Sequence, residues 1–331
     1  MCEQCGNLLG IPAGKGGAVD ALIAAGLASL PEYPEAVALE SEHQPFLTAV
    51  CAKVQPRISE LSFSYLWLWR RYIRCRLSRH GGALLIVMSS PKTGRTTLFP
   101  PLLVDEQAAA QTMQSVLDAH AAEGTLSFAR VPAGPATACE GRAGLAIKEE
   151  RGRADYVYRA ESMLNLAGKR FRQKRQHIAK FRAACPDAVY RELDSGLARE
   201  CAAFSRGWLE THPNKQLEGL QREVETTVLL LENWDRLPFT GGALLEGERI
   251  LAFAVGERLN ADTLAVRVEK ADNALAGSYQ VIAQEFVRHA GAGYTWINRE
   301  QDLGVPGLRR AKKSWYPDHL LRKYRVSRRD R

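Results

Sequence analysis

The chain has 331 residues, of which 46% are hydrophobic and 25% charged, and its formal net charge is +8. This composition excludes a disordered or collagen-like chain, and the length favours two domains of about 100–200 residues each. No apolar run reaches the ~20 residues that span a bilayer. Glu3 stands where an export signal carries Lys or Arg, so we expect a cytoplasmic location, with contact to a membrane surface left open.

The seven cysteines do not predict a disulfide framework. Cys2 and Cys5 form a Cys-x-x-Cys pair, but no second pair with zinc-finger spacing follows it. Metal binding and redox chemistry are alternatives for this pair, and incidental thiols on a terminal segment are favoured. An odd number of cysteines in a cytoplasmic chain indicates reduced thiols, and we expect no metal site.

The positive charge is concentrated in two stretches. Residues 166–182 carry +7 and residues 309–331 carry +8, so the remainder of the chain carries −7. An uneven distribution of this kind favours a polyanionic partner, which is RNA, phospholipid headgroups or a large phosphorylated cofactor. The alternative is a solvated basic face with a loose tail.

The N-terminal half begins with an appendage, residues 1–40, that is rich in Ala and Gly and contains one short helix at residues 18–30. A first domain is expected over residues 41–150. Its elements are the apolar-aromatic stretch 62–72, a buried strand 83–88, a short strand ending at 100–101, and a helix from Asp105 to about 122. The Pro, Gly and Ala content of residues 131–144 predicts a loop. Trp67, Trp69 and Tyr72 are interpreted as core residues, with base stacking as the alternative.

The second domain is expected over residues 151–331 and has a clearer pattern. We predict a strand at 156–159, a basic helix at 168–184, helices at 197–209 and 218–234, a meander of strands at 242–246, 250–258 and 263–269, a helix at 278–290, a strand at 294–298 and a basic helix around 308–314. This order is that of the GCN5-related N-acetyltransferase (GNAT) core. The predicted fold class is α/β (α+β), with two tandem GNAT-like domains whose sheets are mixed and mostly antiparallel.

The basic helix combines a packing stripe with positive charge. Helical spacing places Lys174 on a semi-apolar stripe with Phe171, Ile178 and Phe181. Phosphate backbones require several positioned cations, and this helix has no acidic partner at i, i+4 to neutralise its own. A merely solubilising surface helix is the alternative. The predicted phosphate-binding residues here are Lys169, Arg170, Lys174, Arg175 and His177.

Several motifs resemble a known family. In order, they are Tyr-x-Tyr at 156–158, Gly-Lys-Arg-Phe at 168–171, Lys-Arg-x-His at 174–177, Glu-Lys-Ala at 269–271, Ile-Asn-Arg-Glu-x-Asp-Leu-Gly at 297–304 and Gly-Leu-Arg-x-Ala-Lys-x-Ser-Trp-Tyr-Pro at 307–317. Together they resemble proteins related to the phosphatidylglycerol lysyltransferase C-terminal domain. The resemblance implies two GNAT-like folds, as in Fem-type peptidoglycan transferases, and transfer of an aminoacyl group from a charged tRNA. The chain lacks the lysyltransferases' transmembrane portion, so the acceptor stays open among lipid, peptide and small molecule.

Direct aminoacyl transfer requires a base for the attacking group and a donor for the developing oxyanion. Loops at strand ends usually carry such groups. Glu269 and Glu300 are the candidate bases, with Asn298 or Tyr316 as oxyanion or leaving-group partners. An ion-pair network that only fixes the loop is the alternative for Glu300 and Asp302. The further predicted substrate- or phosphate-binding residues are Lys270, Gly277, Tyr279, Arg299, Asp302, Arg309 and Lys312.

Two other functions stay open at this stage. An acyl-CoA-dependent GNAT normally carries Gln/Arg-x-x-Gly-x-Gly/Ala before the helix that binds pyrophosphate, whereas here only Gly277 precedes that helix. A non-catalytic module that binds tRNA or an anionic lipid headgroup is the other alternative. The preferred interpretation is an enzyme without a resident cofactor or a covalent intermediate, with aminoacyl-tRNA as its donor substrate and Glu269 and Glu300 converging on one cleft.

Overall fold

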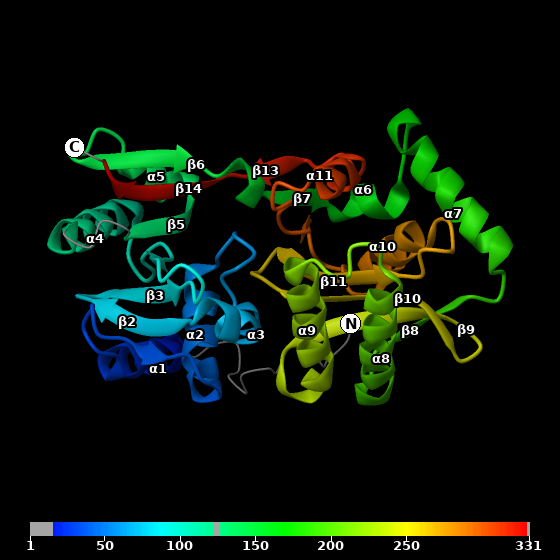
Figure 1. The fold of residues 1–331 in the computed structure, drawn as a ribbon, viewed down its shortest axis with the longest axis horizontal. Coiled ribbons are helices and arrows are strands. Elements are labelled where there is room, and N and C mark those ends of the chain that lie inside the picture. Colours follow the sequence, from blue (N-terminus) through cyan, green and yellow to red (C-terminus); the bar gives the residue numbers. More distant parts are fainter. Residues whose placement is uncertain (1–15, 122–125, 330–331) are drawn as a thin grey trace. The chain divides into compact units, whose positions relative to one another are not determined.

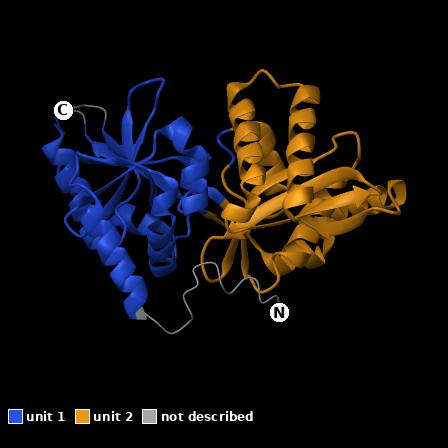
Figure 2. Cartoon of the chain, turned by 90° about the horizontal axis from the view of Figure 1, so that it is seen from below, with its two compact units in different colours: residues 1–155, 302–304, 321–331 blue, residues 156–301, 305–320 orange. Residues whose placement is uncertain are grey.

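The computed structural model describes residues 16–121 and 126–329, so the Cys2–Cys5 pair lies outside the described residues. The chain forms two compact units (Figure 2). Unit 1 comprises residues 1–155, 302–304 and 321–331, and unit 2 comprises residues 156–301 and 305–320. Five cysteines fall within the described residues and all are free thiols: Cys51, Cys75, Cys139, Cys185 and Cys201.

Unit 1 contains a seven-stranded sheet in the order β1-β2-β3-β4-β5-β14-β6 (Figure 1). The strands are β1 Val37–Ala38, β2 Arg76–His80, β3 Ala83–Ser89, β4 Thr96–Leu98, β5 Ser127–Pro132, β6 Leu145–Glu149 and β14 Lys323–Arg328. The helices are α1 Gly16–Ser29, α2 Gln44–Val54, α3 Phe63–Ile73, α4 Glu106–Ala119 and α5 Ala133–Ala138. β4 and β5 are parallel, and α4 connects them.

Local chemistry explains where these helices lie. The Asp105 side chain accepts a hydrogen bond from the backbone N–H of Ala108 and so caps α4, as its sequence predicts. The expected loop at 131–144 is a correction, because α5 occupies Ala133–Ala138. Pro135 lies in the first turn of α5, where its missing N–H would have no helical partner in any case.

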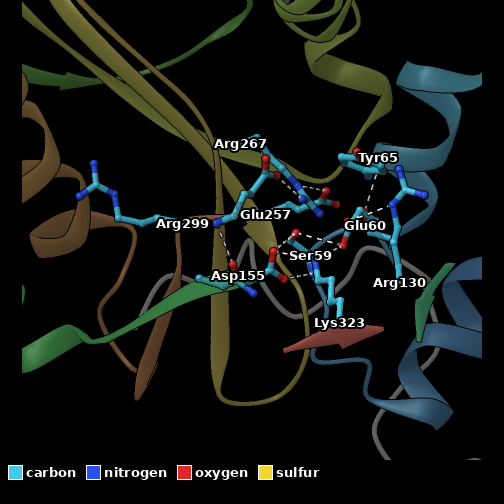
Figure 3. Close-up of polar contacts among 12 residues, drawn as sticks. Ser59, Glu60, Tyr65, Arg130, Asp155, Glu257, Arg267, Arg299 and Lys323 are labelled. Atoms are coloured by element: carbon cyan, nitrogen blue, oxygen red, sulfur yellow. Dashed lines mark hydrogen bonds and ion pairs between the residues drawn. The ribbon is translucent and has the colours of Figure 1, made fainter. Parts of the chain in front are cut away.

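The C-terminal strand joins the sheet of unit 1, whereas the sequence analysis assigned all of residues 151–331 to the second domain. β14 lies between β5 and β6 and is antiparallel to both. Val326 of β14 is fully buried in the apolar core of unit 1. Lys323 is also fully buried and forms ion pairs with Glu60, at 2.5 Å, and Asp155, at 2.6 Å (Figure 3). The burial of Val326 and the ion pairs of Lys323 therefore stabilise β14 in the sheet of unit 1.

Unit 2 contains a second seven-stranded sheet, in the order β13-β7-β12-β11-β10-β9-β8. The strands are β7 Asp155–Arg159, β8 Val189–Glu192, β9 Phe239–Glu246, β10 Arg249–Arg258, β11 Thr263–Ala271, β12 Trp296–Asn298 and β13 His319–Leu321. The helices are α6 Ala160–Asn165, α7 Arg172–Ala184, α8 Ser195–Thr211, α9 Glu218–Glu232, α10 Ser278–His289 and α11 Pro306–Lys313. The predicted antiparallel meander is β9-β10-β11, and α10 then leads to β12, which is parallel to β11.

Helices cover both faces of this second sheet. Ala252 and Ala254 of β10 belong to the core cluster that includes Ile282 and Phe286 of α10. Phe253 lies between them in sequence and packs instead edge-on against Phe204 of α8, with ring centroids 6.0 Å apart. Because successive strand residues point to opposite faces, α10 and α8 cover different sides, which we call the α10 face and the α8 face.

The fold prediction is confirmed: the protein is α/β, with two mixed, mostly antiparallel seven-stranded sheets. Each sheet has the GNAT-like feature of antiparallel strands followed by a parallel pair that a helix connects. Across residues 16–121 and 126–329, no helix combines the length and the apolar character needed to cross a bilayer.

Candidate active site

The segment after β12 has a constrained backbone. Glu300 and Tyr316 have φ angles of 56° and 53°, in the left-handed region that side chains other than glycine rarely adopt. The buried Asn298 side chain accepts a hydrogen bond from the N–H of Glu300 at 2.8 Å and so fixes the turn. Lys312 fixes the same turn from α11, because its ammonium donates to the carbonyl of Arg299. Strained residues that neighbours hold in this way cluster at functional sites.

Arg299 points to the α10 face and forms an ion pair with Glu269 of β11. The side chains are 12% and 13% exposed. The guanidinium also lies 5.2 Å from the ring centroid of Trp315 and 5.7 Å from that of Tyr158. Burial alone would lower the pKa of Arg299, but the Glu269 carboxylate outweighs it and the pKa is raised. Arg299 therefore stays charged at neutral pH, inside a largely apolar surrounding.

This ion pair is incompletely satisfied. Glu269 Oε1 and Arg299 Nη1 are both buried and have no hydrogen-bond partner among the described residues. A buried polar atom without a partner costs about 1–3 kcal/mol, and more when it is charged, so such atoms are rare in folded proteins. The pair thus leaves one buried acceptor atom and one buried donor atom unused.

Lys174 of α7 lies beside this pair. Its ammonium donates to the Ser314 hydroxyl at 2.6 Å and lies 4.8 Å from the centroid of the Trp315 ring. Burial, with repulsion from Arg299, lowers the pKa of Lys174 to about 8. A general acid or base works best when its pKa lies near the working pH, so Lys174 is suited to proton transfer. The sequence analysis predicted Lys174 as a phosphate-binding residue and placed it on the packing stripe.

Glu300, the other candidate base, points to the α8 face. It pairs at 2.6 Å with Arg267, whose side chain is 5% exposed. Arg267 also binds Glu257 at 2.7 Å (Figure 3). A β-bulge in β11 explains why the Arg267 side chain points to the α8 face, where it meets Glu300. Val268 and Val266 oppose the consecutive residues Val255 and Gly256, so Arg267 is an extra residue in β11.

The bulge separates the two candidate bases. Without it, Arg267 and Glu269 would share a face, because they are two residues apart on one strand. With it, Glu269 faces α10 together with Arg299, whereas Glu300 faces α8 with Arg267. Figure 3 shows the Arg299 side chain pointing away from Arg267 and Glu257. The expected convergence of Glu269 and Glu300 on one cleft is therefore wrong, because the two carboxylates lie on opposite faces of the sheet.

Other predicted residues lie at the edge of this group. Tyr316 is 44% exposed and packs edge-on against Phe171, with ring centroids 5.4 Å apart. The guanidinium of Arg170 lies 5.7 Å from the Tyr316 centroid. Lys169 is exposed on the turn before α7, and Arg309 is partly exposed on α11. These residues keep positive charge at the surface next to the buried pair.

The remaining predicted residues have contacts that stabilise the fold. Lys270 is buried on the α8 face and pairs with Glu223 at 2.8 Å. Arg175 donates to the carbonyls of Leu166 and Gly168. Asp302, in unit 1, is fully buried, pairs with Arg151 at 3.4 Å and accepts a hydrogen bond from the N–H of Gly304.

The amino end of α10 is covered by α7. Gly277 has a φ of 93°, and a Cβ there would lie 2.1 Å from the carbonyl oxygen of His177. Ser278, the first residue of α10, is 1% exposed, and its N–H donates to Leu275. Tyr279 is half-buried, and burial raises its pKa. Gly277 is thus required for close packing of two helices, and it does not present an open turn to a phosphate.

Three residues beside the buried pair were not among the predicted site residues: Tyr158, Ser314 and Trp315. The Tyr158 hydroxyl donates to the carbonyl of Lys312 at 2.8 Å and so ties β7 to α11. Burial raises the pKa of Tyr158, so the hydroxyl stays protonated. All three lie within the motifs Tyr-x-Tyr and Ser-Trp-Tyr-Pro, so these motifs were the sequence signal that could have identified them.

The fold and this site define a tandem GNAT-like protein with a buried, partly satisfied ion pair at its parallel strand pair. The chain belongs to the family described as phosphatidylglycerol lysyltransferase, C-terminal, which matches residues 51–327. An uncharacterised protein of Mycoplasmoides gallisepticum is 22% identical over 176 residues, which are 52% of this chain and 55% of that protein. The chain thus spans about half the length of this curated relative.

Solved structures show the same fold. A conserved protein of unknown function from Bacteroides thetaiotaomicron is 28% identical, with a TM-score of 0.80, and the match covers 89% of this chain and 99% of that one. The C-terminal domain (DUF2156) of a protein assigned as lysylphosphatidylglycerol synthetase from Agrobacterium fabrum has a TM-score of 0.58 at 14% identity, covering 86% and 90%. L-PGS from Bacillus licheniformis has a TM-score of 0.52 at 15% identity, covering 78% and 85%.

Proposed function

We propose that this protein is an aminoacyltransferase that takes an aminoacyl group from aminoacyl-tRNA and transfers it to an amine or hydroxyl acceptor. The observation that carries the proposal is the buried Glu269–Arg299 pair, whose Oε1 and Nη1 atoms have no partner among the described residues. An aminoacyl ester presents an α-ammonium group and a carbonyl oxygen a few bonds apart. The ammonium donates to Glu269 and the carbonyl accepts from Arg299.

The same residues support direct transfer. The acceptor attacks the ester carbonyl, and Arg299 stabilises the negative charge that develops on the carbonyl oxygen. Lys174 in its neutral form takes the proton from the acceptor. The bond between the acyl carbon and the tRNA ribose oxygen then breaks, and that oxygen takes the proton. The products are the aminoacylated acceptor and free tRNA, and no covalent enzyme intermediate forms.

Three observations favour aminoacyl-tRNA over acyl-CoA as the donor. An acyl-CoA GNAT binds pyrophosphate with the turn and helix amino end that follow its central strand. In unit 2 that end is Gly277–Ser278, and α7 covers it. In unit 1, α4 starts with Asp105 and Glu106, whose charges repel a phosphate. The exposed cations Lys169 and Arg170 near the buried pair suit an RNA acceptor stem.

A transfer assay tests the proposal. A pool of radioactively labelled aminoacyl-tRNAs is incubated with the protein and an extract fraction that supplies acceptors, and label in nuclease-resistant product is counted. Glu269→Gln should lower transfer by about 10²-fold or more, since it removes the charge that holds the ammonium. Glu248→Gln removes an exposed carboxylate of unit 2 and is the matched control. Labelled product from acetyl-CoA, and none from any aminoacyl-tRNA, would show that the proposal is wrong.

A further inference from the structure

Helix α3 of unit 1 carries a row of aromatic side chains that reaches the surface. Tyr65, Trp69 and Tyr72 follow one another at helical spacing, with ring centroids 6.1 Å and 5.9 Å apart. All three are partly exposed. Trp67, in contrast, is 8% exposed and belongs to the core. The interpretation of these aromatics as core residues therefore holds for Trp67 and not for Trp69 or Tyr72.

Arginine side chains lie at one end of this aromatic row. Arg130 has a φ of 58° beside an irregularity in the β5–β14 pairing, which aims its guanidinium at Glu60 at 3.1 Å. Burial, followed by repulsion from Arg130, lowers the pKa of Arg153, although Tyr65, Glu60 and Glu150 act to raise it. A chain of cations and rings thus runs within unit 1 from Arg130 through Arg153 and Tyr65 to Trp69 and Tyr72.

The carboxylates around this group pair mainly with other cations. Glu60 and Asp155 pair with Lys323 and Arg130, and Glu150, which also attracts Arg153, pairs with Arg325. Lys323 binds the first two of these carboxylates and Arg130 binds Glu60, whereas Arg153 forms no ion pair within the part of the chain that the structure describes. Glu60 and Glu150 attract the Arg153 charge but do not outweigh its desolvation, so an anionic ligand beside this partly buried arginine is favoured.

We propose that this surface of unit 1 binds the single-stranded 3′ end of tRNA, with bases stacked on the α3 aromatic row and a backbone phosphate at Arg153. The inference rests on the proposed function for its choice of RNA. Base stacking on aromatic rings tolerates any base, since every base has a π-face, and it requires the unpaired nucleotides that a tRNA 3′ end supplies. An anionic lipid headgroup would use the arginine and leave the ring row without a role.

The surrounding charge supports this partner. Residues 70–76 contain four arginines and no acidic residue. Arg70 is committed to the fold, because it donates to the Trp67 carbonyl at 2.6 Å and lies over that ring. Arg71 and Arg74 are exposed at the end of α3. They add a salt-dependent attraction for a phosphate backbone next to the stacking surface.

Fluorescence anisotropy with a labelled ACCA oligonucleotide tests the inference on the full chain. Trp69→Leu should weaken binding about tenfold, since stacking on one aromatic side chain is worth roughly 1–3 kcal/mol per base, and Trp69→Phe should restore most of it. Arg153→Gln should weaken binding and flatten its salt dependence. Arg95→Gln removes an exposed arginine of unit 1 and should change neither. A blunt-ended RNA duplex long enough to stay paired should bind without any dependence on Trp69.

Other outcomes would overturn the inference. ACCA binding that stays within twofold in folded Trp69→Leu would show that the row is not a stacking surface. Loss of binding to phosphatidylglycerol vesicles in Arg153→Gln, with ACCA binding unchanged, would assign the site to lipid. Either result leaves the proposed function standing if labelled amino acid still moves from tRNA to an acceptor. ACCA binding through Trp69 without any such transfer would instead support this site and contradict the proposed function.

Discussion

Replacing Lys174 with Met should stabilise the protein and lower its activity strongly. Burial, with repulsion from Arg299, lowers the pKa of Lys174 from 10.5 to about 8. A shift of this size corresponds to about 3 kcal/mol of unfavourable free energy for the charged form. Met keeps most of the apolar stem and loses the hydrogen bond to Ser314, which is worth about 1 kcal/mol. The expected gain at pH 7 is therefore about 2 kcal/mol.

The pH dependence follows from the direction of the shift. Below pH 8 both the folded and the unfolded protein carry a protonated Lys174, so the full unfavourable free energy of burying its charge is present. Between pH 8 and 10.5 the folded protein has released the proton and the unfolded chain has not, so wild-type stability rises relative to that of the variant. The difference between wild type and Lys174→Met should shrink over this range and reach its smallest value near pH 10.5.

Urea denaturation at pH 6, 7, 8 and 9.5 measures this difference, and Lys180→Met, which removes an exposed lysine from the same helix, is the matched control. The rate of aminoacyl transfer is the second measurement. Wild-type transfer should rise with pH through about 8, and Lys174→Met should lose about 10²–10⁴-fold without weaker tRNA binding. A variant less stable than wild type at pH 7, or a stability difference that does not vary with pH, would refute the reasoning.

Further predictions concern residues that the structure assigns to the fold. Lys323→Met should cost about 3–5 kcal/mol in urea denaturation, because two buried carboxylates lose their shared cation, and a loss below about 1 kcal/mol would contradict this. Gly277→Ala should lower the melting temperature, since its Cβ would meet an α7 carbonyl, whereas Gly207→Ala, in open space within a helix, should be neutral or stabilising. Glu300→Gln should lower stability through its lost ion pair with Arg267 and leave the pH–rate profile unchanged, and an altered profile would restore Glu300 as a candidate base.

The sequence predicts elements of both units well where their signals are local. The meander turns, the Asp105 cap and the packing stripe of α7 each depend on residues a few positions apart. The position of Lys174 follows from that stripe, since it shares spacing with Phe171, Ile178 and Phe181, all of which are buried. The stripe does not predict that burial and repulsion from Arg299 lower the pKa of Lys174.

Non-local pairing could not be predicted in the same way. The alternation in Lys323–Arg328 is compatible with an edge strand in either sheet, and only the burial of Lys323 with Glu60 and Asp155 decides between them. The separation of Glu269 from Glu300 depends on a one-residue bulge at Arg267, which has no signature in the sequence Val-Arg-Val-Glu-Lys. A single inserted residue reverses which side chains share a face.

The most direct test of the account compares tRNA that carries an amide-linked, non-hydrolysable aminoacyl group with the same tRNA uncharged. Equilibrium binding to the wild-type protein should favour the charged form by tenfold or more, since a charge-assisted hydrogen bond contributes about 1.5–3 kcal/mol. Glu269→Gln should remove this preference and leave the affinity for uncharged tRNA as it was, because the aminoacyl group is the part of the charged tRNA that we propose the carboxylate contacts. Equal affinity for charged and uncharged tRNA in the wild-type protein would contradict the account.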